Sequence, residues 1–318
     1  MPHRILAAVA AGFLILISAN AQSGRPTAGQ RTMKLSEAIQ FIRPSVVQIL
    51  VRFTPPPASG GIPVMPSRPV PLGTGFLINE DGYVVTAFHV VRAFENFQGQ
   101  GQKHLLVGIA APNLEKYKGL SMRGGFGLAG CDIIGEDARH DLALLKLKQN
   151  PFKGELGTVA VVNGQKIEYA HKAATLLPGR PLDGEAIAVS GYPLSSTVLI
   201  TTSGNLASAW AYDVADVHVP GSPEWFRFPD VADSYLADVR VNGGNSGGPV
   251  YSVENGKVIG VCVASPLVPV LYIDGDHEIA SIGNRPLYYN SGLSIVVPIN
   301  YVIEMLKKNN LKWLGASH

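Results

Sequence analysis

The chain has 318 residues, of which 46% are hydrophobic and 16% are charged, and its formal net charge is +2. A charge this small gives no electrostatic reason to expect nucleic acid or an anionic membrane as a partner. The 35 glycines and 23 prolines favour many short strands and turns over long amphipathic helices. The eight histidines are scattered, without a CxxC or HExxH motif, so we expect neither a metal nor another cofactor.

Residues 1–21 have the three-part layout of a secretory signal peptide. Arg4 precedes an apolar run over residues 5–18, and Ala-Asn-Ala at 19–21 supplies the small-x-small pattern of a signal-peptidase site. An uncleaved anchor is the alternative, but the run is shorter than the roughly 20 residues needed to cross a bilayer. We therefore expect cleavage near Ala21, export to the periplasm or the extracellular space, and no stable membrane insertion afterwards.

The rest of the chain has many strand patterns and few helix patterns. Residues 22–33 predict a flexible lead-in, and residues 34–42 predict a short helix that ends before Pro44. A second helix is expected near the C-terminus, at about 300–308. Asp81-Gly82, between two apolar runs, predicts a β-hairpin. Further strand patterns cover residues 45–53, 105–110, 131–135, 142–146, 186–190, 198–202, 235–239, 258–263 and 294–297.

This pattern indicates an all-β protein built as a sandwich or a barrel. The strand pattern is interrupted around residues 148–182 by a polar, Gly-containing connection. We therefore expect two β units of comparable size. The first covers residues 34–172 and the second covers residues 173–318, including the closing helix.

Three short segments carry residues that suit catalysis. His89 follows an apolar stretch and is interpreted as the end of a strand, where a lone histidine is more often structural than catalytic. Asp141 opens an apolar strand, where an aspartate is equally well a turn residue. Ser246 lies among four glycines in Gly-Gly-Asn-Ser-Gly-Gly at 243–248. Glycines permit the positive φ values of a tight loop, and such a loop turns the N–H groups of Gly244 and Ser246 toward an oxyanion.

The three residue types are useful together because of their proton affinities. A serine hydroxyl is a poor nucleophile near neutral pH, so an imidazole must take its proton during attack. A buried carboxylate orients that imidazole and stabilises the imidazolium that forms. His89, Asp141 and Ser246 follow one another in the order His, Asp, Ser. None is decisive singly, but together they predict a serine hydrolase.

The chain resembles the trypsin/chymotrypsin superfamily of serine proteases, and within it the HtrA (Deg)-type proteases. The matching segments follow the family's order from about residue 40 to about residue 305, so the similarity is not a single-motif match. They are RPSVVQI at 43–49, GTGFLINEDGYVVTAFHVV at 73–91, DLALLKL at 141–147, AIAVSGYPL at 186–194, TTSGNLAS at 201–208, GGNSGGPV at 243–250, VIGVCVA at 258–264 and SGLSIVVPI at 291–299.

The resemblance implies two six-stranded antiparallel β-barrels with the active site in the cleft between them. It implies that His89 is the general base, Asp141 its orienting carboxylate and Ser246 the nucleophile. The amides of Gly244 and Ser246 are the implied oxyanion donors. An extended polypeptide substrate is expected to pair by strand addition along the cleft. The residues implied for binding it are Val263, Ala264, Ser265, Leu293, Ser294 and Ile295.

The chain departs from the family pattern after the protease domain. HtrA proteins usually carry PDZ domains after the protease domain, and because the sequence stops at His318 we expect none here. Family-style oligomerisation is then possible but unsupported.

Export makes a disulfide conceivable, but Cys131 and Cys262 lie in different halves of the chain. We expect them to be two separately buried free thiols.

The expected function is that of an exported serine endopeptidase that forms an acyl-enzyme. One alternative is a trypsin-fold binding or chaperone-like protein whose site is resting or silent. Another is an α/β-hydrolase esterase, since residues 244–248 also fit G-x-S-x-G. That fold requires the order Ser, Asp, His with a helix after the serine, whereas strand-like sequence follows Ser246 here. The esterase is therefore disfavoured.

Overall fold

The computed structural model describes residues 32–56, 65–110, 126–155, 161–162, 165–166, 171–209, 233–270, 281–282 and 285–315. The predicted signal peptide and nearly all of the predicted lead-in lie outside these ranges. Among the helices of these ranges, none is long and apolar enough to cross a membrane. Residues 33–318 form one compact unit, to which the description below applies.

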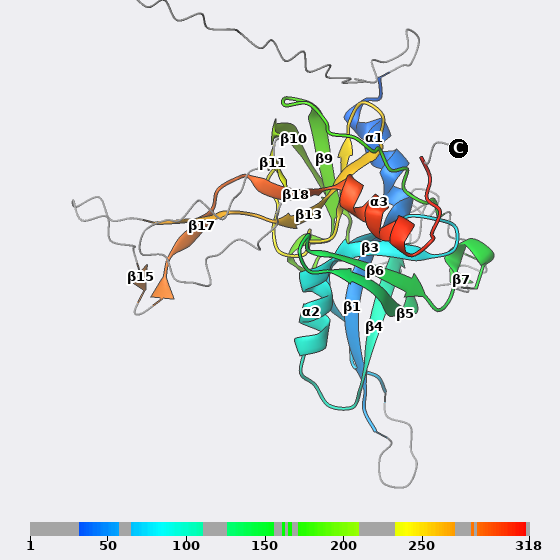
Figure 1. The fold of residues 1–318 in the computed structure, drawn as a ribbon. Coiled ribbons are helices and arrows are strands. Elements are labelled where there is room, and N and C mark those ends of the chain that lie inside the picture. Colours follow the sequence, from blue (N-terminus) through cyan, green and yellow to red (C-terminus); the bar gives the residue numbers. More distant parts are fainter. Residues whose placement is uncertain are drawn as a thin grey trace, which may run out of the picture. The chain divides into compact units, whose positions relative to one another are not determined.

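Six antiparallel strands of the first half form a closed barrel, in the lower part of Figure 1. They are β1 (Val46–Thr54), β2 (Val70–Leu77), β3 (Tyr83–Ala87), β4 (Gln102–Ala110), β5 (Phe126–Asp137) and β6 (Leu142–Leu147). Their order around the barrel is β1-β2-β3-β6-β5-β4. The predicted hairpin joins β2 to β3, and Gly82 in its turn has φ of +80°, which glycine adopts without strain.

Six strands of the second half form a second closed barrel. They are β9 (Ala186–Gly191), β10 (Ile200–Ser208), β11 (Tyr235–Asp238), β12 (Pro249–Ser252), β13 (Val258–Ala264) and β18 (Ser294–Pro298). Their order is β10-β11-β18-β13-β12-β9. The closed barrels confirm the predicted all-β fold of two six-stranded units and exclude the sandwich.

Two groups of buried hydrophobic side chains fill the molecule. The larger group occupies the first barrel and continues into the second through Tyr251, Val261 and Val297. The smaller group, which includes Ile187 and Ile259, fills the rest of the second barrel. Because the larger group spans both barrels, close packing holds the barrels against each other, and residues from both can meet at fixed positions.

Both predicted helices are present, as α1 (Leu35–Ile42) and α3 (Ile299–Lys308). Ile42 of α1 and Leu306 of α3 are fully buried members of the larger hydrophobic group. The closing helix α3 therefore packs in the core that includes the first barrel, although it follows the last strand of the second (Figure 1).

The structure corrects the interpretation of the segment after β3. The sequence placed His89 at the end of a strand, but β3 ends at Ala87 and helix α2 (Phe88–Asn96) begins at the next residue. Val90 and Val91 are buried. These β-branched neighbours favour a strand by local propensity, and burial of one helix face against the barrel overrides that preference.

The remaining elements are short. Three two-stranded sheets pair β7 (Val161–Val162) with β8 (Gln165–Lys166), β14 (Leu267–Pro269) with β17 (Tyr288–Asn290), and β15 (Ser281–Ile282) with β16 (Arg285–Pro286). Single 3-10 turns are η1 (Arg43–Ser45) and η3 (Pro151–Lys153), and η4 (Pro193–Ser195) is a turn in which Leu194 has a non-helical backbone conformation.

Candidate active site

His89 and Asp141 come from neighbouring parts of the first barrel. His89 lies in the first turn of α2, directly after β3, and Asp141 directly precedes β6. Strands β3 and β6 pair with Ala87 opposite Leu142, so the ends that carry the two residues lie side by side. The Phe88 amide donates to the Asp141 carbonyl at 3.0 Å and continues this pairing by one more bond.

The Asp141 carboxylate accepts two hydrogen bonds from His89. Its Oδ1 accepts from the His89 backbone N–H at 2.8 Å, and its Oδ2 pairs with His89 Nδ1 at 2.7 Å. Asp141 is only 4% exposed, whereas the His89 side chain is 46% exposed. Since a carboxylate accepts, Nδ1 carries the proton and Nε2 is left to act as a base.

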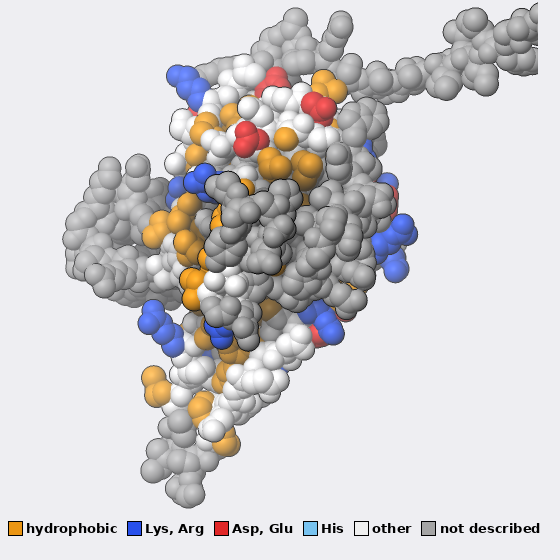
Figure 2. All heavy atoms as spheres, turned by 90° about the vertical axis from the view of Figure 1, so that its left-hand side faces the viewer, with side chains coloured by type: hydrophobic (Ala, Val, Ile, Leu, Met, Phe, Trp, Pro, Cys, Tyr) orange, Lys and Arg blue, Asp and Glu red, His pale blue; other side chains and the backbone are white. Residues whose placement is uncertain are grey.

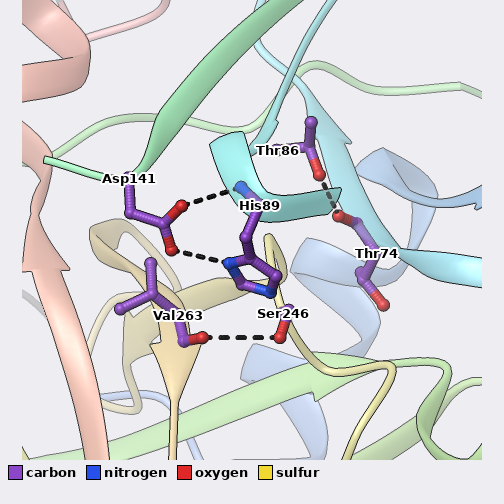
Figure 3. Close-up of polar contacts among 6 residues, drawn as sticks. All are labelled: Thr74, Thr86, His89, Asp141, Ser246 and Val263. Carbon is purple, nitrogen blue, oxygen red and sulfur yellow. Dashed lines mark hydrogen bonds and ion pairs between the residues drawn. The ribbon is translucent and has the colours of Figure 1, made fainter. Parts of the chain in front are cut away.

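Ser246 lies in a tight loop between β11 and β12. Gly244 and Gly247 have φ of +103° and +83°, values that side chains rarely adopt. The Gly247 amide donates to the Cys262 carbonyl of β13 at 2.7 Å, which holds the loop on the second barrel. Figure 3 shows the His89 imidazole between the Asp141 carboxylate and Ser246. The structure thus brings together the three predicted catalytic residues.

The Ser246 hydroxyl donates to the Val263 carbonyl at 3.4 Å (Figure 3). Within the described part of the chain, no hydrogen bond joins it to His89. The 3.4 Å contact is long for an O–H···O bond, so it holds the hydroxyl weakly. Hydrogen bonds of catalytic groups are often loose before a substrate binds, so this geometry is compatible with proton transfer from Ser246 to His89.

Within the described residues, the backbone amides of Gly244 and Ser246 are available to bind an anion. The Leu194 amide donates to the Gly243 carbonyl at 2.8 Å and so fixes the orientation of the peptide between Gly243 and Gly244. Among the described residues, no acceptor is bonded to the N–H of Gly244 or of Ser246. Leu194 and Ser195 have φ of +54° and +58°, a strained pair in the turn that makes this contact.

Thr74 of β2 ties the Ser246 loop to the first barrel. Its hydroxyl donates to the Gly244 carbonyl at 2.6 Å and accepts from the Tyr192 amide at 3.0 Å. Its own amide donates to the Ser246 carbonyl at 2.9 Å. Thr74 is fully buried. Residues of both barrels therefore support the loop.

Cys262 lies beneath the Ser246 loop but is no rival nucleophile. It is 1% exposed, and burial raises the pKa of its thiol to about 12. Cys131, in the first barrel, is also a free thiol, and burial, with a smaller contribution from Asp132, raises its pKa to about 12. Because a thiolate is the reactive form, both thiols are inert near neutral pH.

The six predicted substrate-binding residues are neighbours at one end of the β13–β18 pair. Ala264 lies opposite Ile295, and the Ser265 hydroxyl donates to the Leu293 carbonyl at 3.1 Å. Val263, Ser294 and Ile295 are buried, so these three residues present little surface to a ligand. Ala264, Ser265 and Leu293 are half-buried.

Sequence reasoning missed Thr74 and Leu194. Thr74 lies in a Gly-Thr-Gly strand segment, and nothing in that pattern distinguishes a strand threonine from one that contacts a distant loop. Leu194 follows a proline in an ordinary-looking Tyr-Pro-Leu turn. Its role is carried by a backbone N–H, which no side-chain signal can reveal.

Comparisons with known proteins show the family to which the chain belongs. A family model described as "Trypsin-like peptidase domain" matches residues 73–261, more than half of the chain. Several relatives carry the name "Probable periplasmic serine endoprotease DegP-like", and two of them are compared with the chain below. The one from Brucella suis biovar 1 is 29% identical over 197 residues, and the match covers 62% of this chain and 28% of the relative. The one from Rickettsia conorii is 26% identical over 249 residues, covering 76% and 35%.

The chain therefore matches only about a third of the length of these curated relatives, 28% of one and 35% of the other. Among solved structures, the HtrA-type protease AlgW with a decapeptide superposes with a TM-score of 0.50 at 17% identity, covering 86% of this chain and 67% of that one. This likeness shows a shared fold. By the family match over residues 73–261, the chain belongs to the trypsin-like peptidase domain family, whose HtrA-type members it resembles.

Proposed function

We propose that the protein is an exported serine endopeptidase in which His89, Asp141 and Ser246 form the catalytic triad. The observation that carries the proposal is the buried Asp141 carboxylate, which accepts from both nitrogen donors of His89 beside Ser246. Support also comes from the order of the three residues in the chain and from the family to which it belongs.

In this reaction Ser246 attacks the scissile carbonyl carbon while His89 Nε2 takes the hydroxyl proton. The Asp141 carboxylate keeps the proton of the imidazole on Nδ1 and stabilises the imidazolium. The imidazolium then donates its Nε2 proton to the leaving amine, and an acyl-enzyme ester remains on Ser246. Water repeats the sequence with His89 as base and releases the carboxylic acid.

The Gly244 and Ser246 amides are the proposed oxyanion donors. Both lack an acceptor in the described structure, and the Leu194 contact keeps the Gly243 carbonyl engaged elsewhere. Donors that are already oriented need not reorganise as negative charge develops. Each is typically worth about 10²–10³ in rate.

The proposed substrate is an extended polypeptide with apolar side chains. The AlgW structure contains a decapeptide, and we infer that this chain takes a peptide in the same way, along the β13 backbone. Figure 2 shows hydrophobic side chains on the face where β10, β11 and β17 lie in Figure 1. Leu194, Val198 and Tyr289 are exposed by 76%, 63% and 55%.

Export rests on the sequence of residues 1–21 and on the word "periplasmic" in the names of the two relatives. Cleavage near Ala21 and a periplasmic location follow for this chain as proposals. N-terminal sequencing of the protein purified from the cell envelope tests both.

Covalent labelling tests the triad. The mature chain is incubated with a fluorophosphonate, and the modified residue is located by mass spectrometry. We expect label on Ser246, none in Ser246→Ala or His89→Ala, and full label in the control Ser67→Ala, whose hydroxyl accepts from the Phe53 amide in the first half of the chain. Cleavage of an unfolded protein should follow the same pattern. Cleavage that survives in Ser246→Ala would remove Ser246 from the role.

Among the described residues, the Ser246 hydroxyl is bonded to the Val263 carbonyl and not to His89, and this favours a second candidate function. That function is a binding or chaperone-like protein whose site is at rest. That function requires the wild-type protein to resist fluorophosphonate at rest while it still prevents an unfolded protein from aggregating. Rapid labelling of Ser246 without any added peptide would exclude it.

A further inference from the structure

A chain of side-chain contacts leads from the second half of the molecule to the turn that carries Asp141. The ring of Tyr301, on α3, stacks on the His140 imidazole with centroids 3.7 Å apart and planes 15° apart. The Tyr301 hydroxyl donates to Asp233 Oδ2 at 3.0 Å, and the same oxygen pairs with the Arg180 guanidinium at 2.8 Å. Four segments distant in sequence are thus linked by contacts that end at His140, the residue before Asp141.

His140 is largely shielded from solvent and is hydrogen-bonded to Asp137. Its Nδ1 pairs with Asp137 Oδ2 at 2.7 Å, and its amide donates to Asp137 Oδ1 at 3.2 Å. Its side chain is 14% exposed. The imidazole therefore lies between a carboxylate bonded at one edge and the Tyr301 ring stacked on one face.

The next residue, Asp141, needs such support. Its φ of +52° is a left-handed conformation, which costs most non-glycine residues about 1–2 kcal/mol and which aspartate and asparagine tolerate better than the others. Contacts from neighbouring segments, such as the bond from the Phe88 amide to the Asp141 carbonyl, help to hold the turn in this conformation. A small relaxation of this turn would move the carboxylate away from the two His89 donors.

We propose that His140 and Tyr301 are positioning residues for the triad, which clamp the turn so that the Asp141 carboxylate stays aligned with His89. The inference rests on the proposed function, since alignment matters only if His89 is the base. The Asp233–Arg180 pair fixes the Tyr301 hydroxyl and so fixes the ring. Burial, and then the hydrogen bond to Asp233, raise the pKa of Tyr301, so the phenol stays a donor at neutral pH.

The alternative is that the stack only fastens α3 to the first barrel. Two substitutions separate the alternatives: Tyr301→Leu removes the stacked ring, and Val302→Ala removes a fully buried side chain of the same helix. We expect both to lower stability, by about 2 kcal/mol for the alanine variant. Tyr301→Phe keeps the ring and loses only the bond to Asp233.

The readouts are kcat and KM for one peptide substrate across pH, and the NMR signal of the His89 imidazole N–H, assigned with His89→Ala. In Tyr301→Leu we expect kcat to fall about tenfold with KM unchanged, since misalignment acts in the transition state. A misaligned carboxylate stabilises the imidazolium less, so the acid limb of the kcat/KM profile should move to lower pH. The N–H signal should shift upfield.

Val302→Ala should change none of these readouts, and Tyr301→Phe should stay within about threefold of the wild type in kcat. A folded Tyr301→Leu protein with an unchanged acid limb and N–H signal would overturn the proposal, as would equal changes in Val302→Ala. If the wild type has no Ser246-dependent hydrolysis, the proposed function fails. The N–H signal then still decides whether Tyr301 positions Asp141.

Discussion

The two halves of the candidate site are held in different ways. His89 and Asp141 belong to paired ends of β3 and β6, and the bonds between them lie within the first barrel. The Ser246 loop follows β11 of the second barrel, but Thr74 of the first barrel bonds to it through both backbone and side chain. The His89–Asp141 pair is therefore a local structure of the first barrel, whereas the Ser246 loop depends on how the two barrels pack.

This difference predicts that changes around His89 affect the chemistry with little loss of stability. Changes at the contact between the barrels should disturb the Ser246 loop and the stability together. Each prediction below tests one side of this comparison.

The largest effect is expected at Asp141. Asp141→Asn should lower kcat by about 10⁴-fold because an amide favours the wrong imidazole tautomer. Asparagine tolerates the left-handed backbone at this position, so the melting temperature should change little. Steady-state kinetics and thermal unfolding measure both quantities. Asp141→Ala serves as the contrast, since it should lose activity and also stability. An Asp141→Asn enzyme that keeps most of the wild-type kcat would contradict the assigned role.

Gly247 tests the contact between the barrels. A Cβ at this position would lie 2.2 Å from the Thr74 carbonyl oxygen and 2.3 Å from the Thr86 hydroxyl, in a backbone conformation with φ of +83°. We expect Gly247→Ala to lower the free energy of unfolding by about 3 kcal/mol. Fluorophosphonate labelling of Ser246 should be lost as well.

The matched control for Gly247 is Gly243→Ala, because a Cβ at Gly243 meets no atom within 4 Å. Its stability should be that of the wild type in urea unfolding. If both alanine variants unfold at the same urea concentration, close contact at Gly247 is not what holds the loop.

Thr74 tests the same contact more gently. Thr74→Val removes the donor to the Gly244 carbonyl and the acceptor of the Tyr192 amide. Unsatisfied groups of this kind cost about 1–3 kcal/mol, and we expect kcat to fall about tenfold because the oxyanion amides shift.

Thr86→Val is the control, since the Thr86 hydroxyl donates to the Thr74 carbonyl and, among the described residues, has no hydrogen bond to the Ser246 loop. It should lose similar stability and keep kcat. Equal losses of kcat in the two variants would mean that general packing, not the bond to Gly244, sets the loop.

The smallest effect is expected at the two cysteines, one in each barrel. Burial raises the pKa of both thiols to about 12, so near neutral pH neither should react with iodoacetamide in the folded protein. Both should react fully in urea, as counted by mass spectrometry. Rapid modification of one thiol in native buffer would show that its barrel opens more readily than the other.

Much of the fold was predictable because strand patterns are local. The hairpin at Gly82, most strands and both terminal helices follow from nearest-neighbour chemistry and apolar spacing. Helix α2 was missed because Val90 and Val91 favour a strand locally, and only packing against the barrel favours the helix. The three residues of the proposed triad were predicted from their types and their order, but their meeting depends on barrel closure, which no local pattern encodes.

The sequence alone determined the residue types of the site and the glycines of the Ser246 loop, since both follow from chemistry at single positions. Only the tertiary structure decided that Thr74 and the Leu194 amide hold that loop, and that Tyr301 stacks beside Asp141. The bond from Thr74 to Gly244, for example, joins residues 170 positions apart in the chain. Such contacts form through backbone groups and buried packing, and a single sequence carries no signal that pairs one residue with the other.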